Sequence, residues 1–264
     1  MLEKRIISAA ILIIIIALAV SLRWVFNVAI TAFIIIGLYE FFTMLEKKGI
    51  CTYKYFGIGI GAIIPLSILF RFELTKKWEL LFIVLTLLFL IIMQFKRREN
   101  SGVIVDISTT LFGILYISWF LSFLIKIRYL ANGAGLLTTV LLITKLGDIG
   151  AYLAGMRFGK TPLLPRISPK KSVEGAIGGL VFSVIGALIS KAFLDFSYLH
   201  LILMGVLFGL LGQLGDLSES LMKRDCQVKD SGNILPGMGG VLDEVDSLLF
   251  TAPAFYFYMN IILK

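Results

Sequence analysis

Long apolar runs constrain the fold of this 264-residue chain more than any other feature. A helix that crosses a membrane needs about 20 mainly apolar residues, and in lipid only helices and closed barrels satisfy every backbone polar group. We therefore predict an all-α, polytopic integral membrane protein with about nine transmembrane helices. The predicted spans are Ile6–Leu22, Trp24–Leu45, Tyr55–Phe70, Leu80–Phe95, Val103–Ile125, Ala134–Ala154, Ala176–Phe193, Leu199–Met222 and Val241–Leu263.

The first of these runs has some features of a signal peptide, because Lys4 and Arg5 precede its apolar core. No small-x-small cleavage site follows it, and Arg23 and Trp24 lead directly into the next run. We expect the first helix to be retained.

Composition supports a membrane protein and argues against a nucleic-acid partner. Hydrophobic residues make up 58% of the chain and charged residues 16%, whereas a soluble domain has about 25% charged residues. The net charge of +8 would suit nucleic acid, but basic residues of membrane proteins usually lie in loops beside anionic lipid. We expect no nucleic-acid partner.

The distribution of basic residues predicts the orientation. When the loops are assigned alternately to the two sides, the side of the N-terminus receives twice as many Lys and Arg residues as the other side. Because basic loops stay in the cytoplasm, we expect a cytoplasmic N-terminus and cytoplasmic motif loops, with the protein in a bacterial inner (plasma) membrane.

No soluble domain or internal repeat stands out, so residues 1–264 are expected to form a single integral membrane domain. Three groups of three helices are a natural subdivision. Residues 1–78 would be a scaffold that could support a homodimer, residues 79–174 would include a cytoplasmic basic loop, and residues 175–264 would include the most polar segment.

Few residues could bind a soft metal. Cys51 and Cys226 lie in different polar loops on the predicted cytoplasmic side, where thiols stay reduced. The single histidine, His200, has no cysteine or second histidine near it in sequence, so the usual zinc ligand set cannot form. Any bound metal must then have oxygen ligands, which favours Mg²⁺ or a similar hard cation.

Three polar residues of one predicted span share a helix face. Lys145, Asp148 and Tyr152 are spaced at i, i+3 and i+7. Ionisable groups inside a span are costly and are functional candidates. The alternative is that Lys145 and Asp148 only form an ion pair with each other.

A basic loop follows that span. Its cations are Arg157, Lys160, Arg166, Lys170 and Lys171. Ser168 and Ser172 can donate hydrogen bonds, and Ser172 is placed to cap the next helix. This pattern suits a phosphate-rich ligand, although from charge alone an ordinary inside-positive loop explains it equally well. The spacing of a P-loop is absent.

The segment Gly212–Ser247 is unusually rich in charge. In a helix, Asp216, Ser220 and Lys223 would share one face, and the glycines after Pro236 would reverse the chain so that Asp243 and Asp246 open the last span. Helix capping could explain two of these carboxylates, but not those on a neighbouring helix end. Carboxylates and lysines that converge from two helix ends predict phosphoryl or nucleotidyl transfer.

This segment also resembles a known family. The pattern S-L-M-K-R-x₄-K-D-S-G-x-x-L-P-G-x-G-G-x-x-D-x-x-D, from Ser220 to Asp246, is similar to the signature of the phosphatidate cytidylyltransferases, also called CDP-diacylglycerol synthases. The upstream GDIGAYLAGMRFGK and SPKKSVEG stretches resemble that family's second characteristic region. The resemblance covers Asp148–Ser247, whereas the N-terminal half resembles the family mainly in its helix count.

The resemblance implies an enzyme that condenses CTP with phosphatidic acid, giving CDP-diacylglycerol and pyrophosphate. Asp216, Asp243 and Asp246 would be ligands of Mg²⁺, paired with a second cation such as K⁺. Ser220 and Lys223 would contact phosphate or complete the metal shell. The implied substrate-binding residues are Asp148, Lys160, Ser168, Lys170, Lys171, Ser172, Arg224, Lys229 and Asp230.

Two positions depart from the family pattern. Met238 and Glu244 stand where the family usually has His and Arg. Because the three aspartates, Ser220 and both lysines of the pattern remain, we expect an active but divergent enzyme. The alternatives are a cytidylyltransferase for another lipid phosphate, such as an isoprenoid ether lipid, a transporter for a phosphorylated solute, and a catalytically silent lipid-binding homologue. A transporter commonly shows related halves with interrupted helices, and neither stands out here.

Overall fold

A computed structural model describes residues 21–70, 78–97, 101–235, 237 and 239–263. Helices dominate these residues, which divide into two compact units. Unit 1 comprises the described residues up to Ile125 together with Cys226–Leu242. Unit 2 comprises Lys126–Asp225 and the residues from Asp243 onwards.

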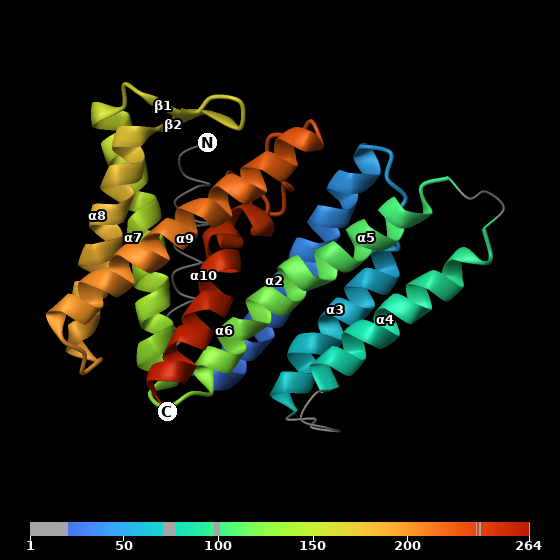
Figure 1. The fold of residues 1–264 in the computed structure, drawn as a ribbon, viewed down its shortest axis with the longest axis horizontal. Helices are drawn as coiled ribbons and strands as arrows, with labels where there is room; N and C mark the ends of the chain where they lie inside the picture. The colour runs from blue at the N-terminus through green and yellow to red at the C-terminus, as the bar shows by residue number, and fades with distance from the viewer. Residues whose placement is uncertain (1–20, 71–77, 98–100, 236, 238, 264) are drawn as a thin grey trace. The chain divides into compact units, whose positions relative to one another are not determined.

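Unit 1 is a helical bundle (Figure 1). Its helices are α2 (Arg23–Lys47), α3 (Lys54–Leu69), α4 (Trp78–Gln94) and α5 (Val103–Gly113), and α5 continues through a π-helical stretch (Ile114–Trp119) into α6 (Phe120–Arg128), which reaches unit 2. A Cβ at Gly57 or Gly61 of α3 would collide with Phe42 or Leu38 of α2. The glycine cluster of α3 therefore permits close helix packing.

Unit 2 contains the remaining long helices. They are α7 (Gly133–Phe158), α8 (Val173–Ile189), α9 (Tyr198–Asp225) and α10 (Val241–Ile262, in unit 2 from Asp243), with a 3₁₀ turn at Ser190–Ala192. Helices α7 and α8 lie side by side (Figure 1), and α9 packs against both. Phe208 of α9 contacts Phe255 and Tyr258 of α10 through their aromatic rings.

A two-stranded hairpin interrupts the otherwise helical chain between α7 and α8 (Figure 1). Strand β1 (Pro162–Leu164) pairs antiparallel with β2 (Ser168–Ser172). The prediction treated this region only as a basic loop. The Ser172 hydroxyl accepts a hydrogen bond from the Gly175 backbone N–H at 3.1 Å, so the predicted cap of the next helix is confirmed.

The predicted all-α membrane class is confirmed in its coarse form. Within the described ranges, six helices are long and apolar enough to cross a membrane, and two apolar helices are shorter. The six are Arg23–Lys47, Val103–Arg128, Gly133–Phe158, Val173–Ala192, Tyr198–Asp225 and Val241–Ile262; the shorter two are Lys54–Leu69 and Leu80–Gln94. Nearly all of the first predicted span, Ile6–Leu22, lies outside the described residues. The count of nine, the orientation and the three-group subdivision stay predictions.

Candidate active site

The end of α9 and the beginning of α10 bring the predicted carboxylates together within unit 2. The predicted helix that carries Asp216, Ser220 and Lys223 on one face is confirmed, since all three lie in α9. A Cβ at Gly215 would lie 2.5 Å from the Asp246 carbonyl oxygen and 3.3 Å from Ser247 Cα. The absence of a side chain at Gly215 therefore lets α10 approach α9 where both helices carry an aspartate.

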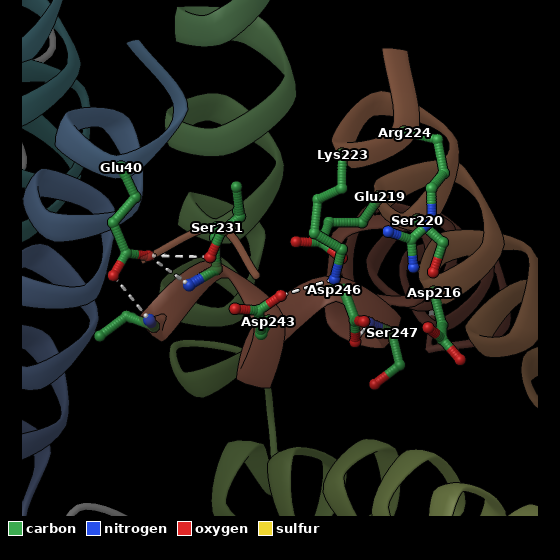
Figure 2. Close-up of polar contacts among 12 residues, drawn as sticks. Glu40, Asp216, Glu219, Ser220, Lys223, Arg224, Ser231, Asp243, Asp246 and Ser247 are labelled. Atoms are coloured by element: carbon green, nitrogen blue, oxygen red, sulfur yellow. Dashed lines mark hydrogen bonds and ion pairs between the residues drawn. The ribbon is translucent and has the colours of Figure 1, made fainter. Parts of the chain in front are cut away.

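Lys223 lies between two carboxylates (Figure 2). Its ammonium group contacts Asp243 Oδ1 at 2.5 Å and forms a second ion pair with Glu219, one helical turn earlier in α9. The side chains of Lys223, Asp243 and Glu219 are 11%, 12% and 0% exposed. Because water screens these charges little, the lysine is held firmly where α9 meets α10.

The hairpin supplies a second lysine. Lys171 of β2 contacts Asp216 Oδ1 at 2.6 Å and lies 3.4 Å from the Ser220 hydroxyl oxygen. Arg224 of α9 donates from Nε to the Ile167 carbonyl oxygen at 3.1 Å, next to β2. The basic loop is therefore attached to the carboxylate-bearing face of α9, which its charge pattern alone could not establish.

Helix α7 adds a third lysine and a further aspartate. Lys145 lies 3.6 Å from Asp148, which confirms their pairing, and it also donates to the Glu244 carbonyl oxygen of α10 at 2.7 Å. The Ser247 hydroxyl donates to Asp148 at 3.3 Å. The Lys145–Asp148 pair is thus part of a larger network that reaches the first turns of α10.

Carboxylates outnumber lysines in this network. The carboxylates are those of Asp148, Asp216, Glu219, Asp243, Glu244 and Asp246, and the lysines are Lys145, Lys171 and Lys223. The charges of Asp216, Glu219 and Asp148 all act on the Asp246 carboxylate, which accepts a hydrogen bond from the Ser247 backbone N–H at 2.5 Å. Such an excess of carboxyl oxygens over lysines favours binding of a hard cation.

The described residues do not form a ready-made cage for a metal. No group of three His, Cys, Asp or Glu side chains among them is arranged to hold an ion. The donor chemistry nevertheless fits Mg²⁺, which usually takes one or two protein carboxylates and completes its octahedron with substrate phosphates and water.

Several predicted site residues lie elsewhere. Lys160 and Lys170 are exposed, and Ser168 pairs with Leu164 across the hairpin. Lys229 and Asp230 are exposed residues of unit 1. The predicted chain reversal is confirmed by reciprocal backbone hydrogen bonds between Leu235 and Gly239, whereas Met238 lies outside the described residues.

Sequence reasoning missed two members of the network. Glu219 precedes Lys223 by four residues, a spacing at which oppositely charged side chains meet on a helix, so this pairing could have been predicted. Ser247 carries no comparable signal. Its role depends on α7 and α10 meeting in the folded unit, which brings its hydroxyl to Asp148.

The close approach at Gly215 gives a testable prediction. Gly215→Ala should lower the free energy of unfolding by about 1–3 kcal/mol, because the added methyl group must push Asp246 away from α9. Gly59→Ala is the matched control, since its Cβ would meet nothing within 4 Å and both variants gain the same helix propensity. Thermal unfolding in detergent measures both. A Gly215→Ala midpoint equal to that of Gly59→Ala would contradict the packing described here.

Comparison with known proteins identifies the family of this chain. The model of the cytidylyltransferase family matches residues 3–262. The chain is 35% identical to the phosphatidate cytidylyltransferase of Synechocystis sp., over 98% of this chain and 97% of the relative. It is 33% identical to that of Bacillus subtilis, over 89% and 88%, and 41% identical to that of Staphylococcus aureus strain COL, over 66% of each. The chain therefore belongs to the cytidylyltransferase family.

Proposed function

We propose that this protein is a CTP:phosphatidate cytidylyltransferase. An oxygen of the phosphatidate phosphate forms a bond with the α-phosphorus of CTP, the bond from that phosphorus to the bridging α–β oxygen breaks, and pyrophosphate leaves. The products are CDP-diacylglycerol and pyrophosphate. One observation supports the proposal most: the two lysine–aspartate pairs of unit 2 lie on the family's characteristic segments, in a chain matched by the family along nearly its whole length.

The lysines of the network suit the substrates' charge. The ammonium groups of Lys171 and Lys223 each pair with an aspartate. A substrate phosphate that enters the site can replace the aspartate as the partner of either lysine. The Ser220 hydroxyl, close to Lys171, can donate to a phosphate oxygen. Within unit 2, we assign the catalytic role to Asp216, Ser220, Lys223, Asp243 and Asp246, and substrate binding to Asp148, Lys160, Ser168, Lys170, Lys171, Ser172 and Arg224.

We further propose that Asp216, Asp243 and Asp246 hold Mg²⁺, with a second cation such as K⁺ nearby. When bound, a divalent cation would neutralise the phosphate charge that grows during transfer. The excess of carboxylates over lysines in unit 2 supports this assignment. The aspartates contribute oxygen ligands, and the lysines orient the phosphates.

We also propose a membrane location for the active site and a homodimeric state for the protein. The basic residues of the loop between α7 and α8 favour placing the active site at the cytoplasmic face of a bacterial inner membrane. A phosphatidate whose acyl chains remain in the bilayer can present its phosphate group at that face of the membrane. The helices of residues 1–78 are our candidate for a homodimer contact.

A related enzyme acting on another lipid phosphate is the strongest alternative. Glu244, which stands where the family usually has Arg, is the observation that favours it, because its carboxyl group interacts electrostatically with Lys145 and Asp148 of the same network. A charge reversal at that position would alter how an anionic acceptor is held. Chemistry at the CTP α-phosphorus would be unchanged.

The function can be tested with purified protein in detergent, labelled CTP, Mg²⁺ and a panel of lipid phosphates that includes phosphatidic acid and an isoprenoid ether lipid phosphate. We expect labelled CDP-diacylglycerol from phosphatidic acid and no product in the presence of EDTA. Product from another lipid alone would identify the alternative acceptor. No product with any lipid, under conditions where the Bacillus subtilis relative is active, would refute the enzyme assignment and favour a transporter or a silent homologue.

A further inference from the structure

A buried carboxylate in unit 1 stands apart from the network described above. Glu40 lies in α2 within the apolar run IIIGLYEFFTML, and only 2% of its surface is exposed. A carboxylate in such a place is costly unless hydrogen-bond donors surround it. Its presence therefore calls for partners, and the structure supplies them from a distant part of the sequence.

The partners of Glu40 lie at the start of α10 and in the segment that precedes it (Figure 2). Oε1 accepts a hydrogen bond from the Val241 backbone N–H at 3.0 Å, and Oε2 accepts one from the Leu242 backbone N–H at 2.9 Å. The Ser231 hydroxyl lies 3.3 Å from Oε2 and donates to it. All of these residues belong to unit 1.

These contacts form a helix cap supplied by another helix. The first backbone N–H groups of a helix have no acceptor within the helix, and a negative charge there is favoured by the helix dipole. Two glycines of the signature segment, residues 220–246, make space for the Glu40 carboxylate. A Cβ at Gly232 or Gly240 would collide with Glu40, and at Gly240 it would also collide with the Ser231 hydroxyl.

The capped residues directly precede a proposed metal ligand. Val241 and Leu242 are grouped with unit 1, whereas Asp243, the next residue of the same helix, is grouped with unit 2. We propose that Glu40 is a positioning residue for the cytidylyltransferase reaction, because it fixes the first turn of α10 and thereby the backbone that carries Asp243. The expected effect of Glu40 on the reaction rate rests on the proposed function. The role of Glu40 in fixing the first turn of α10 does not.

The chemistry of the contacts identifies the decisive substitution. All three donors point at Glu40, so a group with two acceptor oxygens is required. In Glu40→Gln, the amide nitrogen replaces one of those oxygens and faces a donor with another donor. The side-chain volume is unchanged, which separates loss of the cap from loss of packing. Glu40→Asp keeps both oxygens and the charge on a shorter stem.

Two measurements on the full chain in detergent test the proposal. Hydrogen–deuterium exchange, followed by mass spectrometry, should show faster exchange in Glu40→Gln for peptides that begin α10, with α2, α3 and α5 unchanged. In steady-state assays kcat should fall by about 10- to 100-fold, with the KM for CTP within about threefold, since a small displacement of a catalytic group costs rate. Glu40→Asp should show a smaller increase in exchange and a smaller fall in kcat than Glu40→Gln.

Glu46→Gln is the matched control, because Glu46 lies on the same helix with its side chain 43% exposed, and the glutamine oxygen can still accept the hydrogen bond that Lys54 donates. It should behave like the unmodified protein. Unchanged exchange at the start of α10, unchanged kcat, or faster exchange spread over all of unit 1 in Glu40→Gln would each overturn the proposal. Because exchange is read without substrate, it remains decisive even if no lipid phosphate supports activity, an outcome that would refute the proposed function instead.

Discussion

Asp243→Ala should lower kcat for CDP-lipid formation by about 10²–10³-fold or more, the effect expected when several kcal/mol of transition-state stabilisation by a bound cation is lost. Asp243 lies in the first turn of α10 and contacts Lys223 of α9. Removal of the Asp243 carboxylate deprives the site of a proposed metal ligand. The fold should survive, because Lys223 keeps its ion pair with Glu219. A phosphatidate-dependent assay with labelled CTP measures the loss.

Asp195→Ala is the matched control for this variant. Asp195 is a fully exposed aspartate of unit 2 that pairs only loosely with Lys191, one turn away. It should retain normal activity and expression. Near-normal turnover of Asp243→Ala, at saturating Mg²⁺ and with an unchanged thermal midpoint, would remove Asp243 from the ligand set.

Lys223→Met should lose both activity and stability. Without the ammonium group, Glu219 is left as a fully buried carboxylate without its ion-pair partner, which costs about 3–5 kcal/mol in comparable cases. The loss of a cation that orients phosphate should lower kcat by about 10³-fold. Circular dichroism on heating and the CDP-lipid assay measure the two effects separately.

A double variant separates these two consequences. In Lys223→Met with Glu219→Gln, the buried charge is removed together with its partner, so the thermal midpoint should return most of the way to that of the unmodified protein. Activity should stay low, since the lysine is still missing. Recovery of activity together with stability would contradict a direct role of Lys223 in binding phosphate.

Much of the helical framework was predictable because apolar runs of span length leave few alternatives. Eight of the nine predicted runs overlap described helices, with ends displaced by a few residues. The face shared by Asp216, Ser220 and Lys223 followed from helix periodicity alone. The same periodicity could have identified Glu219, four residues before Lys223.

Contacts between distant segments could not be predicted from these patterns. The pairing of Lys171 with Asp216 depends on the hairpin between α7 and α8, whose two short strands carry no alternation of apolar and polar residues. The cap that Glu40 forms on α10 joins residues about 200 positions apart, and a lone glutamate in an apolar run does not indicate its partner. The signature segment is also divided between the two units, which its continuous motif does not suggest.

The fate of the CTP phosphates tests the central claim most directly. The purified protein is incubated with phosphatidic acid and CTP labelled in parallel reactions at the α- or the γ-phosphorus. Attack at the α-phosphorus predicts that α-label enters the lipid product in equal amount to the pyrophosphate released, that γ-label appears only in pyrophosphate, and that Asp243→Ala abolishes both signals. Transfer of γ-label to lipid, or lipid labelling that Asp243→Ala leaves intact, would contradict the account.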